Sequence, residues 1–80
     1  MDIVEINWLD ACGEDAHVDI GDAISFAPIK RHNVGYLIRS DNISTTIVFG
    51  TIENCYVSKV AADKVLVIPQ GMIENIKKLS

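Results

Sequence analysis

The sequence has few aromatic residues, few cysteines and no long apolar run. Aromatic residues make up 6% of the 80 residues, and the chain holds two cysteines. Two cysteines are too few for a disulfide framework, so we expect reduced, buried thiols. No apolar run approaches the roughly 20 residues of a bilayer-spanning helix, and no basic segment follows Met1 as it would in a signal peptide. These absences predict a cytoplasmic protein with no membrane segment.

Positive charge is missing from the first part of the chain. Residues 1–29 carry seven acidic residues and no Lys or Arg, whereas residues 30–80 carry all seven basic residues and four acidic ones. The net charge of −4 disfavours a nucleic-acid polymer as partner, because that binding depends on neutralising phosphates. A local basic pocket for a small anion is compatible with this composition. The charge difference between the two parts also suggests salt-sensitive contacts between copies.

Patterns for catalysis or metal binding are missing too. The cysteines and histidines lack zinc-site spacing, and the acidic residues 14–22 lack the spacing of a calcium loop. No serine lies in a nucleophile elbow, and the glycines form no phosphate-binding loop. Either cysteine could use a histidine as a base, but buried inert thiols are the norm. We predict a protein that is not an enzyme and has no catalytic residue, cofactor or metal.

Aliphatic residues, in contrast, are abundant. Hydrophobic residues make up 49% of the chain, mainly as Ile and Val, which suit strands. Residues 65–76 contain an apolar run, Pro-Gln-Gly and a second apolar run, which is typical of two strands joined by a short turn. We predict an all-β fold, a small five- to six-stranded bent barrel that is Sm-like or SH3-like and forms one domain over residues 1–80. Because so short a chain has a marginal core, we expect a homo-oligomer.

Alternating apolar and polar residues predict which side chains face the core. Strands are expected over residues 3–9, 29–39 and 43–49. The inward residues should be Val4, Ile6 and Trp8 in the first strand and Ile43, Thr45, Ile47 and Phe49 in the third, while Val34, Tyr36 and Ile38 should share one face of the second.

The other segments are predicted with less regular patterns. Residues 51–63 indicate a long hairpin loop with strand at its edges, and residues 65–68 a fully buried strand. Residues 72–79 fit a strand or a helical face, and the short turn before them favours the strand. The acidic residues 10–22 are compatible with loop, strand or helix. Gly35 inside a strand predicts a bend or the close approach of another backbone.

Two short motifs lie between residues 35 and 76. Gly35, Leu37, Asp41 and Val48 form the first motif, and Ile68, Gly71, Ile73 and Ile76 form the second. Their spacing resembles that of the Sm-like family, whose small barrels assemble as rings and bind uridine through an Asn of the first motif and an Arg and Asn of the second. The corresponding positions here are Thr45, Gln70 and Met72. The resemblance therefore implies the barrel and the ring and argues against the usual RNA ligand.

A second resemblance concerns three segments: Trp8–Ala11, Val34–Arg39 and Val67–Met72. Their order is similar to that in small proteins encoded in bacteriophage genomes. One class of phage proteins consists of oligomeric sponges that trap the nucleotide signals of CBASS or Thoeris immunity. This resemblance implies a phage anti-defence protein that sequesters a cyclic oligonucleotide or cyclic ADP-ribose type of signal between subunits. The alternative is an Sm-like RNA-binding or host-protein-binding barrel without a small-molecule ligand.

Basic and aromatic residues are the candidates for binding such a signal. Residues 30–33 read Lys-Arg-His-Asn, in which the guanidinium could fork onto phosphate oxygens. Aromatic rings could stack on a base or cover it. The alternatives are a strand edge protected by charge and aromatic rings that belong to the core or an interface. The predicted ligand-binding residues are Trp8, Lys30, Arg31, His32, Tyr36, Arg39, Tyr56 and Lys59.

Overall fold

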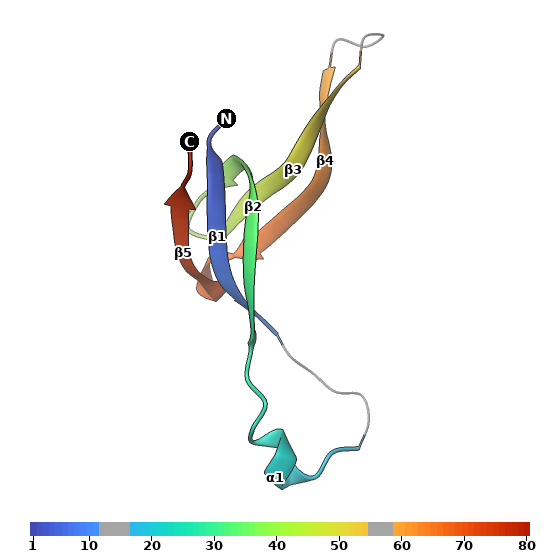
Figure 1. The fold of residues 1–80 in the computed structure, drawn as a ribbon, viewed down its shortest axis with the longest axis vertical. Coiled ribbons are helices and arrows are strands. Elements are labelled where there is room, and N and C mark those ends of the chain that lie inside the picture. Colours follow the sequence, from blue (N-terminus) through green and yellow to red (C-terminus); the bar gives the residue numbers. More distant parts are fainter. Residues whose placement is uncertain (12–16, 55–58) are drawn as a thin grey trace.

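The computed structural model of the protein describes residues 1–11, 17–54 and 59–80, with the backbone alone for Asn54 and Lys59. Within these residues the chain forms five strands, one helical turn and one 3-10 turn (Figure 1). The elements are β1 (Ile3–Asp10), α1 (Ile20–Ala23), β2 (Ile29–Ser40), β3 (Ser44–Asn54), β4 (Lys59–Pro69), η1 (Gln70–Met72) and β5 (Ile73–Lys78). The predicted all-β fold class is confirmed.

The strands form one antiparallel sheet with the order β4-β3-β2-β1-β5. β4 and β5 are the two edges of this sheet, because β5 leaves η1 to pair with β1 and not with β4. The sheet is therefore open within the described residues. The prediction that the barrel closes over residues 65–76 is wrong for a single copy, since closure requires hydrogen bonds between these two edges.

The core lies on one face of the sheet. Val4, Ile6 and Trp8 alternate along β1 and are buried as predicted. They pack with Ile47 of β3 and Ile68 of β4, which are fully buried. Burying one such aliphatic side chain contributes about 1.5–3 kcal/mol. A few residues from three strands thus supply most of the stabilisation that apolar burial provides.

Gly35 in β2 lies against the backbone of β3. A Cβ atom at this position would be 2.7 Å from the Val48 carbonyl oxygen, closer than unbonded atoms approach. The predicted close approach of a backbone is confirmed. Val34, Tyr36 and Ile38 were predicted to share one face. Val34 and Tyr36 do so, since they pair with Glu5 and Ile3 on the face away from the core. Ile38 is exposed at a register shift between β2 and β3.

The inward residues of β3 are predicted correctly in part. Thr45 and Ile47 are buried, but Ile43 and Phe49 are exposed. Ile43 lies in the turn before β3, and Phe49 follows Val48, where the pairing of β3 with β2 stops. Alternation along a strand places side chains on a face, but only a neighbouring element can cover that face.

The C-terminal strands differ from the prediction in one respect and agree in another. Residues 65–68 are not fully buried, because Val65 and Val67 are exposed while Ile68 is buried. β4 is an edge strand with one face on the core, so its side chains alternate. The preferred strand over residues 72–79 is confirmed as β5, which follows the 3-10 turn η1.

Two segments extend beyond this sheet. The predicted loop over residues 51–63 is largely strand, since β3 continues to Asn54 and β4 begins at Lys59. We call residues 49–54 and 59–64 the hairpin, residues 17–28 the α1 arm, and the rest of the sheet the body. The hairpin and the α1 arm lie at opposite ends of the long axis (Figure 1).

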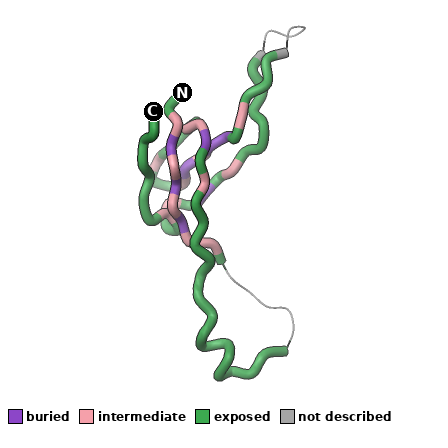
Figure 2. Tube along the Cα trace, in the orientation of Figure 1, coloured by how far each residue is buried: buried purple, intermediate pink, exposed green. Residues whose placement is uncertain are grey.

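The α1 arm contains part of the acidic segment whose structure the sequence left open. It forms a single helical turn, for which the Asp19 side chain accepts a hydrogen bond from the Gly21 backbone N–H at 3.0 Å. Every described residue of this arm is exposed (Figure 2). Among the described residues, no helix combines the length and apolar character needed to cross a bilayer.

Candidate functional site

The basic residues at the start of β2 point to both faces of the sheet. Lys30 pairs with Leu9, Arg31 with Trp8 and His32 with Asn7 across the β1–β2 ladder. Successive strand residues alternate between faces, so Lys30 and His32 share the outer face with Asn7. Arg31 lies on the core side beside Trp8. The predicted cluster is therefore divided, and only two of its cations can act on one ligand.

The outer face carries a row of hydrogen bonds that crosses three strands. His32 of β2 bonds through Nδ1 to Oδ1 of Asn7 in β1, and Asn7 Nδ2 donates to Oδ1 of Asn75 in β5 at 2.6 Å. An amide oxygen only accepts, so His32 Nδ1 is the donor of its hydrogen bond to Asn7. The row fixes the orientation of three polar side chains on a rigid sheet.

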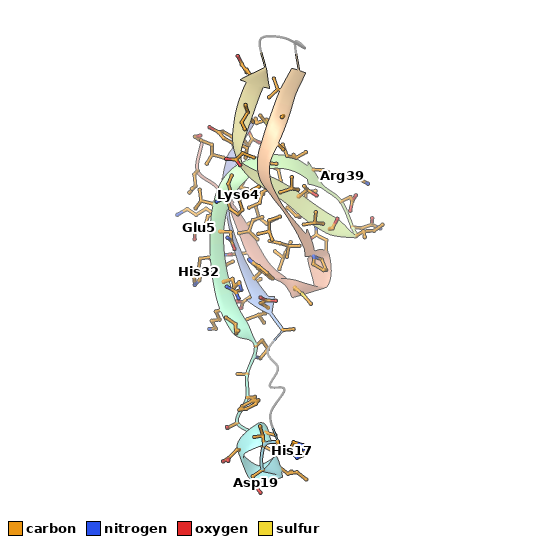
Figure 3. All side chains as sticks on the ribbon, turned by 90° about the vertical axis from the view of Figure 1, so that its right-hand side faces the viewer. Glu5, His17, Asp19, His32, Arg39 and Lys64 are labelled. Atoms are coloured by element: carbon orange, nitrogen blue, oxygen red, sulfur yellow. The ribbon has the colours of Figure 1, made fainter. Side chains whose placement is uncertain are left out.

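Two lysines flank this row. Lys30 pairs with Leu9 in the β1–β2 ladder, and Lys77 pairs with Glu5 in the β1–β5 ladder, so both lysines lie on the outer face. Figure 3 shows Glu5 and His32 on the same side of the sheet. Within the described parts of the chain neither lysine forms an ion pair. We call Asn7, Lys30, His32, Asn75 and Lys77 the polar face.

The two arginines proposed as phosphate ligands lie elsewhere and have acidic partners. Arg31 Nε is 2.7 Å from Asp10 Oδ2, and Arg39 Nε donates to Asp41 Oδ2 at 2.8 Å. Arg39 lies at the far end of β2 from His32, on the other side of the view in Figure 3. Such exposed ion pairs contribute about 0–1 kcal/mol, so they orient the arginines more than they stabilise the fold.

Asp41 is the centre of the turn between β2 and β3. Its Oδ1 accepts from the backbone N–H groups of Ser44 at 2.9 Å and Ile43 at 2.8 Å. These two hydrogen bonds, with the Arg39 guanidinium as a further cause, lower the pKa of Asp41. The carboxylate therefore stabilises the turn, and both of its oxygens already accept hydrogen bonds within the chain.

The aromatic candidates differ in their surroundings. Trp8 is 8% exposed, packs in the core and donates its indole N–H to Asn33 Oδ1 at 2.8 Å. The structure contradicts a base-stacking role for Trp8, because the ring is enclosed by the fold. Tyr36 is half-buried on the outer face opposite Ile3 and Val48, and its role stays a prediction. Tyr56 and the side chain of Lys59 lie outside the described residues.

The positions that resemble the uridine site of Sm-like proteins lie together in part. Gln70 Nε2 donates to the fully buried Thr45 Oγ1 at 2.9 Å and to the Asp41 carbonyl oxygen at 2.5 Å. Ser40 Oγ also lies 2.8 Å from Thr45 Oγ1. These groups are hydrogen-bonded to one another, so they connect the turn after β2 with η1 and leave few hydrogen-bonding groups free for a ligand. Met72 lies at the end of η1.

The polar face contains three residues that the sequence reasoning missed: Asn7, Asn75 and Lys77. Asn7 occupies a polar position of an alternating strand, and Asn75 and Lys77 lie two residues apart in β5. That spacing indicates a shared face, but it does not reveal the register on β1. Among the described residues no group of three His, Cys, Asp or Glu side chains could hold a metal ion.

No protein-family model, curated protein or solved structure matches this chain. The Sm-like and phage resemblances therefore stay predictions made from short motifs.

Proposed function

We propose that this chain is a non-catalytic binding protein that holds a nucleotide-type anion at a site shared between identical copies. In its finer form, the proposal is a bacteriophage protein that sequesters a nucleotide-derived immune signal in the host cytoplasm. The polar face supports the binding part. The phage origin and the kind of signal depend on the resemblance alone.

The chemistry of the polar face suits a nucleotide. The amines of Lys30 and Lys77 can neutralise phosphate oxygens, and the imidazole of His32 offers a further hydrogen-bonding group. The amides of Asn7 and Asn75 offer donors and acceptors of the kind that base edges require. Because hydrogen bonds already connect His32, Asn7 and Asn75, little side-chain entropy is lost when a ligand binds.

The shape of the polar face supports a shared site. The face is the outer side of an open sheet, so a ligand lying on it would keep one side in water. Small-molecule sites bury about 70–90% of a ligand of this size. A second copy that covers the face would exclude that water and bring further cations toward the phosphates.

The second candidate is a module that binds a host protein and no small molecule. The exposed apolar side chains of the α1 arm favour it, since such groups often mark protein contacts. An RNA-binding barrel is less well supported, because the net charge is −4 and Thr45 and Gln70 bond to each other.

Calorimetric titration with cyclic dinucleotides, cyclic trinucleotides and cyclic ADP-ribose isomers tests the proposal. We expect one of these ligands to bind, with a stoichiometry of sites that matches an assembly. Lys30→Ala should weaken that binding about 10–100-fold, the loss of a charge-assisted hydrogen bond, and His32→Ala about tenfold, the loss of a hydrogen bond. Lys64→Ala is the matched control, because Lys64 is an exposed cation of β4 away from the polar face.

Two results would overturn the proposal. The first is the absence of heat with every ligand from a folded protein, which would favour a protein partner. The second is a detected ligand whose affinity is the same for wild type, Lys30→Ala and His32→Ala, which would move the site away from the polar face.

A further inference from the structure

The α1 arm exposes large apolar side chains that nothing in the same chain covers. Ile20 and Ile24 are 79% and 80% exposed, and Phe26 is also exposed. The helical turn of this arm has no buried residue. A single exposed apolar side chain needs no explanation, but several in one short segment mark a contact surface.

The hairpin at the other end has the same property. Ile52 and Val60 are 56% and 62% exposed, and Phe49 is exposed at its base. The two strands of the hairpin pair only with each other beyond residue 48. An isolated two-stranded hairpin is marginally stable in water, so its apolar residues need a covering layer.

The size of the uncovered surface can be compared with that of an interface. The chain exposes 6096 Å², whereas a compact monomer of its 8.8 kDa would expose about 4,800 Å². Its radius of gyration is 16.8 Å, compared with about 12 Å for a compact chain of this length. The excess of roughly 1,300 Å² is larger than the ~800 Å² that each partner buries in a standard interface.

The arrangement of the two segments favours a second copy as the partner. The chain extends over 57 Å, with the α1 arm at one end and the hairpin at the other (Figure 1). The two segments therefore cannot cover each other within one chain. A two-fold axis perpendicular to the long axis brings the α1 arm of each copy beside the hairpin of its partner. One symmetric contact then covers both surfaces in both copies.

We infer that the α1 arm of each copy packs against the hairpin of a second copy, through Ile20, Ile24 and Phe26 on one side and, on the other, through Phe49 and Val60, which the register places on one face of the hairpin. This inference rests on the proposed function only in taking copies of the chain to associate. The two copies meet at this surface whether or not a nucleotide binds.

Sedimentation equilibrium over a range of concentrations tests the contact. We expect the wild type to dimerise, and Ile24→Asp and Val60→Asp each to raise the dimer dissociation constant by at least about tenfold, as for a residue at the centre of an interface. Ile43→Asp is the matched control, because Ile43 is exposed in the β2–β3 turn, outside both segments. It should leave the dissociation constant unchanged. A wild type that stays monomeric at millimolar concentration would overturn the inference.

A sample in which labelled and unlabelled copies are mixed tests which surfaces meet, even if a substitution disturbs the hairpin. Isotope-filtered NMR should detect intermolecular contacts from the Ile20 and Ile24 methyl groups to hairpin protons. An assembly whose intermolecular contacts avoid the α1 arm would refute this interface. A dimer joined as inferred that ignores every nucleotide would instead refute the proposed function.

Discussion

In the body Ile6, Ile47 and Ile68 are fully buried, whereas in the α1 arm Ile20 and Ile24 are 79% and 80% exposed. The residue type is the same, so the difference comes from the neighbouring strands. In the body, three strands contribute to one face and cover one another's side chains. A single helical turn has no such neighbour. The comparison teaches that the body buries its own core, whereas the apolar side chains of the α1 arm and the hairpin are not covered by the described residues of the same chain.

The largest expected effect comes from removing core volume. Ile47→Ala should lower the free energy of unfolding by about 2–5 kcal/mol, since it leaves a cavity. Ile24→Ala should change it by no more than about 0.5 kcal/mol when copies are dilute enough to be separate. Urea denaturation followed by Trp8 fluorescence measures both. Equal losses would mean that the α1 arm packs on its own body.

The next effect tests the close approach of β2 and β3 in the body. Gly35→Ala places a methyl group 2.7 Å from the Val48 carbonyl oxygen, so the strands must separate. We expect a loss of about 1–3 kcal/mol, typical of overpacking. Gly71→Ala is the control, because nothing lies within 4 Å of a Cβ there and its φ is not positive. Similar melting temperatures for the two variants would contradict the tight contact.

A smaller effect is expected where the hairpin joins the body. Lys64 has a φ of 53°, a left-handed conformation that costs a residue with a side chain about 1–2 kcal/mol. Lys64→Gly should remove this strain and raise the free energy of unfolding by up to about 1 kcal/mol, after the entropic cost of glycine. Lys77→Gly, in regular strand, should lower it. Thermal denaturation of both variants shows whether each one raises or lowers the stability of the fold.

The smallest effect concerns the turn that closes β2 and β3. The pKa of Asp41 is lowered from 3.8 by the Ser44 and Ile43 backbone N–H groups and by Arg39. The unfolded state therefore binds the proton more readily. The stabilisation is complete above the unfolded pKa and is lost as pH falls through the folded pKa. The stability difference between wild type and Asp41→Asn should shrink over that acidic range, and a difference that stays constant with pH would contradict it.

Much of the fold could be predicted from local patterns. Alternation in β1 identified Val4, Ile6 and Trp8 as core residues, and Pro-Gln-Gly marked the turn before β5. Gly35 inside a strand predicted the close contact between the backbones of β2 and β3. The exposure of Val65 and Phe49 could not be predicted in this way, because apolar character does not reveal whether another element lies opposite.

The candidate site was predicted less completely. Lys30 and His32 were named from their chemistry, but Asn7 and Asn75 were not, because only the pairing of β5 with β1 places Asn75 beside Asn7. The aromatic ring of Trp8 suited two predictions, one as a core residue of an alternating strand and one as a platform for stacking on a base. The hydrogen bond to Asn33 and the surrounding side chains decide for the core.

The sequence by itself determined that this chain forms strands, where most of them begin and end, and which side chains share a face. These properties follow from φ and ψ preferences and from the two-residue period of a strand, which act between near neighbours. Only the tertiary structure decided that the sheet stays open, that Asn75 and Lys77 join Asn7 on the polar face, and that both projecting segments are uncovered. Those outcomes depend on pairing between residues far apart in the chain, which no local pattern contains.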